Sequence, residues 1–107
     1  MGRRHKIRYT PVAMDDMDEM FSFISLDNVT AAETMLEKLD SQISMLAEFP
    51  NLGSVLSEDD YPLAQRGYRF IVVQPYLVFY RVIEQTVVIH RLLHGRRDYL
   101  RELFAQW

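Results

Sequence analysis

Apolar and polar residues alternate along HKIRYT, residues 5–10. Ile7 and Tyr9 fall on one side of this segment, and Lys6 and Arg8 fall on the other. Alternation with a period of two is typical of a β-strand whose two faces meet different surroundings. The pattern therefore predicts a short strand that lies at a sheet edge or is covered on one face.

A helical period replaces the alternation after Thr10. Thr10 suits the N-cap of a helix, and Pro11 suits its first turn. Apolar residues then recur at helical spacing with acidic residues between them, which predicts an amphipathic helix. The apolar set is Met14, Met17, Met20, Phe21 and Ile24, and the acidic set is Asp15, Asp16, Asp18 and Glu19. Methionine surfaces pack adaptably, so this stripe suits a core or a partner interface, and a homodimer stays open.

A second amphipathic helix is predicted from Thr30 to Phe49. Thr30 and Glu33 have the spacing of a capping box, and Pro50 disfavours helical geometry in the residue before it. The apolar face consists of Ala32, Met35, Leu36, Leu39, Ile43, Leu46 and Phe49. Because only a short break at residues 26–28 separates the two helices, we expect them to form a helical hairpin.

A strand-like pattern returns after a loop at residues 50–62. Three segments, 66–73, 76–83 and 86–94, are rich in β-branched and aromatic residues. The short connections between them force antiparallel neighbours. The order β-α-α-β-β-β predicts an α+β fold in a single domain, residues 1–107, with the helical hairpin packed on one face of a mainly antiparallel sheet.

The last predicted strand carries polar residues towards its end. Strict alternation assigns its residues to two faces: Val87, Ile89, Arg91 and Leu93 to one, and Val88, His90, Leu92 and His94 to the other. Neither face is apolar throughout, which suggests that a binding surface begins at this end of the sheet.

Composition limits the class of protein. The chain has 107 residues, of which 49% are hydrophobic, enough for one core. It contains no cysteine, which fits a reducing compartment. Its basic N-terminus lacks the apolar segment of a secretory signal, and no apolar run approaches the roughly 20 residues that span a bilayer. We expect a cytoplasmic protein with no membrane partner.

The net charge of −3 conceals an asymmetry. Residues 1–61 contain 5 Lys or Arg and 12 Asp or Glu, whereas residues 62–107 contain 7 Arg and 3 acidic residues. Arginine offers a planar set of donors suited to phosphate or carboxylate. An anionic partner on one surface and charges that are merely solvated both remain open.

The segment LLHGRRDYLREL, residues 92–103, combines several reactive side chains. His94 could serve as a general acid or base, or could be bonded to a backbone carbonyl. Arg96 and Arg97 could bind a phosphate, or could pair with neighbouring acidic residues. Tyr99 could stack on a base or pack on the core. The three histidines of the chain lack the spacing of a metal site, so we expect no metal and no cofactor.

Four segments together resemble the RelE/ParE superfamily of bacterial type II toxins. They are FPNLG at 49–53, RGYRF at 66–70, YLVFYRV at 76–82 and VVIHRLLHGRRD at 87–98. The resemblance runs over nearly the whole chain and implies a toxin encoded beside its antitoxin, as in plasmid stabilisation or addiction modules. It also implies that the cognate antitoxin neutralises the toxin by wrapping an extended or helical segment over it.

The resemblance leaves two targets. RelE-like members are mRNA interferases, endoribonucleases that cleave ribosome-bound mRNA without a metal, whereas ParE-like members inhibit DNA gyrase. If the chain were such an enzyme, Arg97, His94 and Arg69 would be the catalytic candidates. Arg91, Arg96 and Tyr99 are then the candidates for binding the nucleic acid or another target.

Departures from the RelE pattern favour the ParE-like assignment. Leu77 stands where the RelE type has an arginine, Leu103 stands where it has a tyrosine, and no lysine follows Lys38. We therefore expect a ParE-like toxin or one of unassigned target, with the ribonuclease as the alternative. A decayed toxin that acts only as an antitoxin-binding partner is a further alternative, suggested by the acidic balance.

Overall fold

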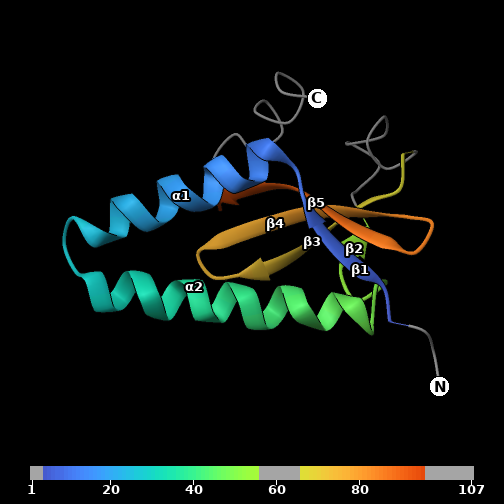
Figure 1. The fold of residues 1–107 in the computed structure, drawn as a ribbon, viewed down its shortest axis with the longest axis horizontal. Helices are drawn as coiled ribbons and strands as arrows, with labels where there is room; N and C mark the ends of the chain where they lie inside the picture. Colours follow the sequence, from blue (N-terminus) through green and yellow to red (C-terminus); the bar gives the residue numbers. More distant parts are fainter. Residues whose placement is uncertain (1–3, 56–65, 96–107) are drawn as a thin grey trace.

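The structure, a computed structural model, describes residues 4–55 and 66–95 (Figure 1). Its elements, in chain order, are β1 (Lys6–Tyr9), α1 (Pro11–Ser25), α2 (Val29–Ser44), the 3-10 turn η1 (Met45–Ala47), β2 (Ser54–Val55), β3 (Tyr68–Val73), β4 (Tyr76–Ile83) and β5 (Thr86–His94). The predicted order β-α-α-β-β-β is confirmed, with the short strand β2 added between the helices and the last three strands.

The strands form one five-stranded sheet in the order β1-β5-β4-β3-β2. β1 runs parallel to β5, and every other neighbouring pair is antiparallel. A parallel pair needs a long crossover, and the helical hairpin is part of the connection between β1 and β5. The prediction of a mainly antiparallel sheet is confirmed. The first strand, predicted at a sheet edge or covered on one face, lies at an edge.

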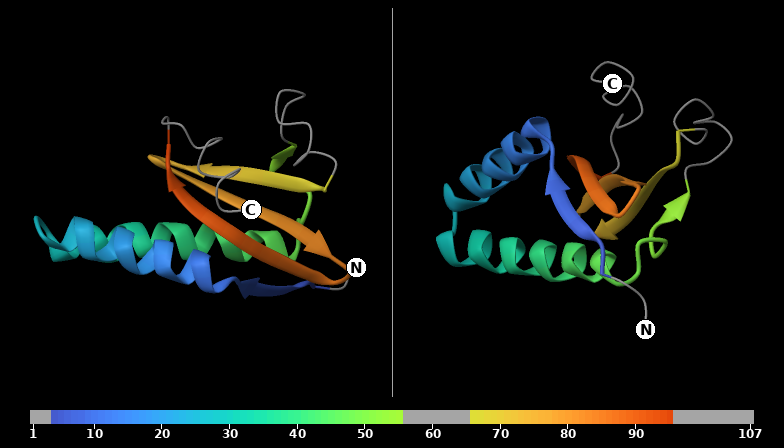
Figure 2. Two further views of the ribbon diagram at one scale, coloured as in Figure 1. Left: turned by 90° about the horizontal axis from the view of Figure 1, so that it is seen from above. Right: turned by 45° about the vertical axis from the view of Figure 1, so that its right-hand side comes forward.

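The two helices lie on one side of the sheet, and their connecting end projects past the strands (Figures 1 and 2). Buried side chains from both layers form a single core. Its members are Ala13 and Met20 of α1, Leu39 and Ile43 of α2, Leu46 of η1, and Ile71, Val73, Tyr76, Val78, Tyr80, Val87, Ile89 and Leu92 of the sheet. The helical hairpin therefore covers one face of the sheet, as predicted.

The beginning of α1 agrees with the sequence. The Thr10 hydroxyl accepts a hydrogen bond from the Ala13 N–H at 3.0 Å, as expected of an N-cap residue. The same hydroxyl donates to the His90 carbonyl of β5 at 3.0 Å. One threonine therefore both starts the helix and fixes it to the sheet.

The predicted start of the second helix is wrong by two residues. Asn28 is the N-cap, because its side-chain oxygen accepts a hydrogen bond from the Ala31 N–H at 3.0 Å, and the helix begins at Val29. Thr30 therefore lies inside the first turn and cannot cap it. The α-helix also ends before Phe49, at Ser44, where the chain tightens into η1.

Strict alternation fails in β5 because of a β-bulge. Phe79 pairs with Arg91 and Tyr80 pairs with Ile89, so the register between β4 and β5 skips His90, which is the bulged residue. Beyond the bulge the two faces exchange, and Leu92 joins Val87 and Ile89 in the core. The predicted assignment of Leu92 to the opposite face from Val87 is therefore wrong.

Candidate functional site

The described part of the chain stops at Gly95, at the beginning of the predicted functional tail. Arg96, Arg97 and Tyr99 lie outside the described residues, and their roles remain predictions. His94 and Gly95, which precede them, are placed.

His94 is exposed at the end of β5. Its ring meets the ring of Tyr76 on the neighbouring strand, with 5.3 Å between centroids and an interplanar angle of 84°. The next N–H, that of Gly95, donates to the Pro75 carbonyl at 2.6 Å. A Cβ at Gly95 would lie 2.8 Å from the same oxygen, so only glycine fits here without a shift. The chain therefore leaves the sheet from a fixed point, with an accessible imidazole beside it.

Arg91 is not exposed to a target. Its Nε lies 2.8 Å from Asp16 Oδ2 and its Nη2 lies 3.2 Å from Asp16 Oδ1, which makes a two-point ion pair between β5 and α1. The side chains of Arg91 and Asp16 are only 8% and 13% exposed. The same carboxylate accepts a hydrogen bond from the Leu92 N–H at 3.0 Å. This geometry favours a structural role for Arg91, and any contact with a target would disturb the pair.

Arg69 is also engaged by the fold. Its Nη1 donates to the Gly53 carbonyl at 2.8 Å and to the Asn51 carbonyl at 3.4 Å. The Tyr80 hydroxyl donates to the Pro50 carbonyl at 2.7 Å and accepts from the Gly53 N–H at 2.9 Å. These contacts hold the segment that leads into β2 against β3 and β4.

Three of the four segments that carry the family resemblance meet at this point. Gly53 belongs to FPNLG, Arg69 to RGYRF and Tyr80 to YLVFYRV. A Cβ at Gly53 would lie 2.7 Å from the Phe70 carbonyl oxygen and from the Tyr80 ring, so a larger residue cannot be accommodated. These segments therefore specify a structural latch, and the role of Arg69 as a catalytic residue stays a prediction.

The sheet does not bring Arg69 and His94 together. Arg69 pairs with Tyr80 and His94 pairs with Tyr76, on opposite sides of β4. The strand rise puts these two levels about 13 Å apart, and two strand spacings add about 10 Å across the sheet. Arg69 therefore cannot share one phosphate with His94 in this arrangement.

The bulge places His90 in a cluster that the sequence did not predict. The His90 ring packs edge-on against Tyr68, with 4.9 Å between centroids, and the guanidinium carbon of Arg81 lies 4.9 Å from the centre of the Tyr68 ring. Burial, helped by the charge of Arg81, lowers the pKa of His90 to about 4. His90 is therefore neutral near pH 7. No signal in the local pattern marks this cluster, because it depends on a register shift.

Neither a metal cluster nor a membrane-spanning helix is found among the residues that the structure describes. Within 4–55 and 66–95, no group of three or more His, Cys, Asp or Glu side chains could hold a metal ion. No helix among these residues has the length and hydropathy needed to cross a bilayer.

The chain matches known proteins over most of its length. Residues 7–99 match the model of the family described as the ParE toxin of the type II toxin-antitoxin system parDE. Toxin ParE3 of Caulobacter vibrioides is 35% identical over 104 residues, which cover 96% of each chain. A solved structure, the chromosomal ParDE TA system from P. aeruginosa, has a similar fold, with a TM-score of 0.70 and 19% identity over 89% of this chain and 100% of that chain.

Proposed function

This chain belongs to the ParE family of type II toxin-antitoxin toxins, and from that premise we propose that it arrests growth by acting on DNA gyrase until its cognate antitoxin neutralises it. The observation that supports gyrase over ribosome-bound mRNA is the dispersal of the predicted site residues that the structure describes. Of the catalytic candidates, Arg69 lies in the β2–β3 latch and His94 lies at the end of β5. Arg91, a candidate for binding the target, is buried against Asp16.

Metal-independent cleavage of RNA has strict geometric requirements. An acid, a base and cationic donors must all reach one phosphate within hydrogen-bond distance. Arg69 is separated from His94 by two strand spacings, with β4 between them, and moving Arg91 would leave Asp16 as an unpaired buried charge. Breaking such a pair costs about 3–5 kcal/mol. The described residues therefore favour a toxin that acts by binding over one that cleaves RNA.

The tail residue Arg97 supplies the test of the target. After a short induction, we expect gyrase-trapped, linearised DNA and intact translated mRNA. Arg97→Ala should abolish the DNA damage if the tail carries the activity, while Lys38→Ala on the exposed face of α2 should leave it unchanged. Primer extension that shows fresh codon-aligned 5′ ends, lost in Arg97→Ala, would establish the ribonuclease instead. Normal growth during strong expression of the folded protein would support a decayed toxin.

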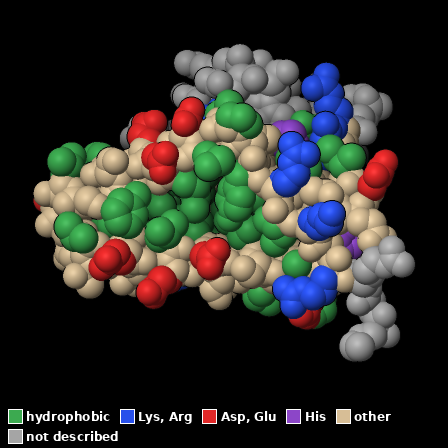
Figure 3. All heavy atoms as spheres, viewed as in Figure 1, with side chains coloured by type: hydrophobic (Ala, Val, Ile, Leu, Met, Phe, Trp, Pro, Cys, Tyr) green, Lys and Arg blue, Asp and Glu red, His purple; other side chains and the backbone are tan. Residues whose placement is uncertain are grey.

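The helical hairpin offers a surface for the antitoxin. Phe23, Leu26 and Val29, around the turn between α1 and α2, are 71%, 86% and 56% exposed. Figure 3 shows apolar side chains over this end and along the surface between the helices, with acidic side chains on both sides. Large exposed apolar groups of this kind usually mark an interaction site.

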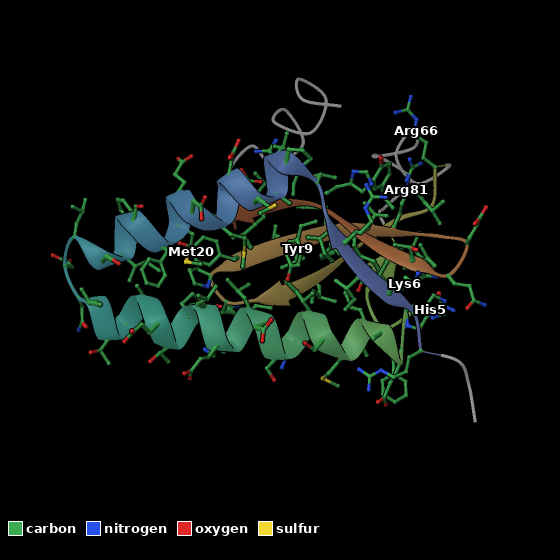
Figure 4. All side chains as sticks on the ribbon, viewed as in Figure 1. His5, Lys6, Tyr9, Met20, Arg66 and Arg81 are labelled. Atoms are coloured by element: carbon green, nitrogen blue, oxygen red, sulfur yellow. The ribbon has the colours of Figure 1, made fainter. Side chains whose placement is uncertain are left out.

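The charge of the hairpin indicates the kind of segment that it accepts. Residues 11–44 contain eight acidic residues and a single lysine. Burial raises the pKa of Tyr9, and the negative charge of Asp40 on α2 raises it further. Asp40 therefore lies near Tyr9, which Figure 4 shows between the two helices. We therefore expect the antitoxin to contribute a segment that combines apolar and basic residues.

Binding of the antitoxin to hairpin variants tests this surface. Leu26→Ser should weaken binding of the purified cognate antitoxin at least tenfold, about 1.4 kcal/mol. Ile83→Ser removes an exposed apolar side chain at the end of β4 and should leave the affinity unchanged. Equal affinities for Leu26→Ser and the wild type would place the antitoxin elsewhere on the toxin, without bearing on the choice of target.

A further inference from the structure

The charges of this protein are divided between its layers. The strands β1 to β5 contain five basic residues, Lys6, Arg8, Arg69, Arg81 and Arg91, and no acidic residue. The helical hairpin carries the opposite charge. An uneven distribution of this kind creates a positive potential over part of the surface even though the whole chain is acidic.

Four basic residues gather at the end of the sheet where β5 begins. Arg8 pairs with Val88, Val88 pairs with Arg81, and Arg81 pairs with Tyr68, which makes one row across four strands. Neighbouring strands are about 4.8 Å apart, so the backbones of Arg8 and Arg81 are separated by about 10 Å. Lys6 is the next residue on the same side of β1.

Arg66 completes this group from the residues just before β3. Burial raises the pKa of Tyr68, and the charges of Arg81 and Arg66 oppose this rise, which places both guanidinium groups near the same ring. Figure 4 shows Arg66, Arg81 and Lys6 at the same end of the molecule, where Figure 3 shows a band of Lys and Arg side chains. We call Lys6, Arg8, Arg66 and Arg81 the basic strip.

No ion pair between described residues includes the basic strip: the pairs are Arg4–Glu48 and Arg91–Asp16. Lys6, Arg8 and Arg66 are exposed. Arg81 is half-buried, and its Nε is buried without a hydrogen-bond partner. The half-buried side chain of Arg81 is still partly accessible to an anion, although its Nε is not.

The surroundings of Arg81 hold its charge in place without neutralising it. The guanidinium rests on the face of the Tyr68 ring, where a cation–π contact contributes about 0.5–2 kcal/mol. The His90 ring packs edge-on against Tyr68. His90 is neutral at pH 7, so it adds neither a competing positive charge nor a negative one. The strip therefore presents fixed positive charge to solvent.

We propose that the basic strip binds the phosphate backbone of duplex DNA. Several cations spaced along a row match a polyanion with regularly spaced charges better than they match an isolated carboxylate. Tyr68 is only 4% exposed, so its ring cannot serve as a stacking platform for bases. Binding should therefore be independent of sequence, and it should be stronger for duplex than for single-stranded DNA, whose charge density is lower.

The strip lies away from the point where β5 ends. Val88 and His94 lie six residues apart on the same strand, which corresponds to about 20 Å. DNA binding by the strip can therefore be measured with the purified toxin alone. It holds or fails regardless of whether gyrase is the target.

Fluorescence anisotropy with a labelled duplex of about 20 base pairs, measured over a range of salt concentrations, tests the proposal. We expect Arg81→Gln and Arg8→Gln each to weaken binding several-fold and to reduce the slope of log K against log salt by about 1. Lys38→Gln removes the same charge from α2 and should change neither. Arg8 is exposed, so Arg8→Gln remains informative even if Arg81→Gln fails to fold.

Three outcomes would overturn the proposal. The first is the absence of measurable binding to the duplex at about 50 mM salt, where phosphate contacts are strong. The second is an equal effect of Lys38→Gln and Arg8→Gln, which would indicate only a loss of net charge. The third is competition by polyglutamate at the same charge concentration as effectively as by unlabelled duplex, which would indicate a surface for an acidic peptide.

Discussion

Tyr80 joins parts of the chain that are distant in sequence. Its ring is fully buried in the core, and its hydroxyl bonds the backbone at Pro50 and Gly53. Arg69 reinforces the same segment through the Gly53 carbonyl. At the scale of single residues, the catalytic candidate Arg69 and the core residue Tyr80 thus both hold backbone.

Replacing Tyr80 by phenylalanine should reveal the value of this hydroxyl. Tyr80→Phe leaves the Gly53 N–H and the Pro50 carbonyl without their partner, and an unsatisfied buried group costs about 1–3 kcal/mol. We expect a decrease of that size in the free energy of unfolding, measured by urea denaturation. Tyr76→Phe removes the same atom from the same face of β4 and should cost less. Equal losses for the two variants would contradict the latch.

His90 should make stability depend on pH. Burial, and to a lesser extent the charge of Arg81, lowers its pKa from 6.5 to about 4. Between these two pH values His90 is therefore protonated in the unfolded chain and neutral in the folded chain. Between these two values the unfolded state holds more protons, and stability therefore falls as the pH falls. The free energy of unfolding has its full value above about pH 6.5, and the protonation of His90 should lower it by about 2 kcal/mol at pH 5.

Comparison with a neutral variant isolates this effect from the titration of carboxylates. His90→Gln cannot take up the proton, so its free energy of unfolding should change less between pH 7.5 and pH 5 than that of the wild type. Chemical denaturation at the two pH values measures both differences. The same pH dependence in the two proteins would show that His90 is not responsible.

The helices and strands differ in how far local sequence specifies them. The bounds of β4 and β5 agree with the predicted segments 76–83 and 86–94, because tight turns at both ends limit each strand. β2 was missed, since its two residues form a strand only through their pairing with Arg69 and Phe70. An element this short has no period of its own to detect.

The start of α2 gives a test at the scale of an element. Asn28→Ala should destabilise the protein by about 0.5–2 kcal/mol, because it leaves the Ala31 N–H uncapped. Thr30→Ala should cost little, since Thr30 is exposed and lies inside the first turn. Thermal unfolding of the two variants distinguishes the structure from the capping box that the sequence predicted. A larger loss of stability for Thr30→Ala than for Asn28→Ala would support the capping box instead.

At the scale of the whole molecule, the helical layer is mainly acidic and the sheet is basic. Among the described residues, few ion pairs join the two layers. Arg91 and Asp16 form a buried pair that links α1 to the sheet. The apolar core joins the layers over a larger area. The remaining basic side chains at the start of β5 stay available for an anion.

Asp16→Asn should weaken the attachment of α1 to the sheet. The substitution removes the carboxylate charge that pairs with the buried Arg91, and breaking a buried pair costs about 3 kcal/mol or more. Asp15→Asn alters the neighbouring exposed residue and should be nearly neutral. Urea denaturation of both variants measures the difference, and a neutral Asp16→Asn would mean that the ion pair contributes no net stability.

The sequence by itself determined the order and period of the elements and the likeness to a toxin family. Those features depend on local alternation, turn residues and short motifs. Only the tertiary structure decided that Arg69 closes a latch, that Arg91 is buried and that His94 stands apart from both. It also assembled the basic strip from residues about sixty positions apart. Pairing register and burial arise from long-range contacts, and a single bulged residue changes them without altering the local pattern.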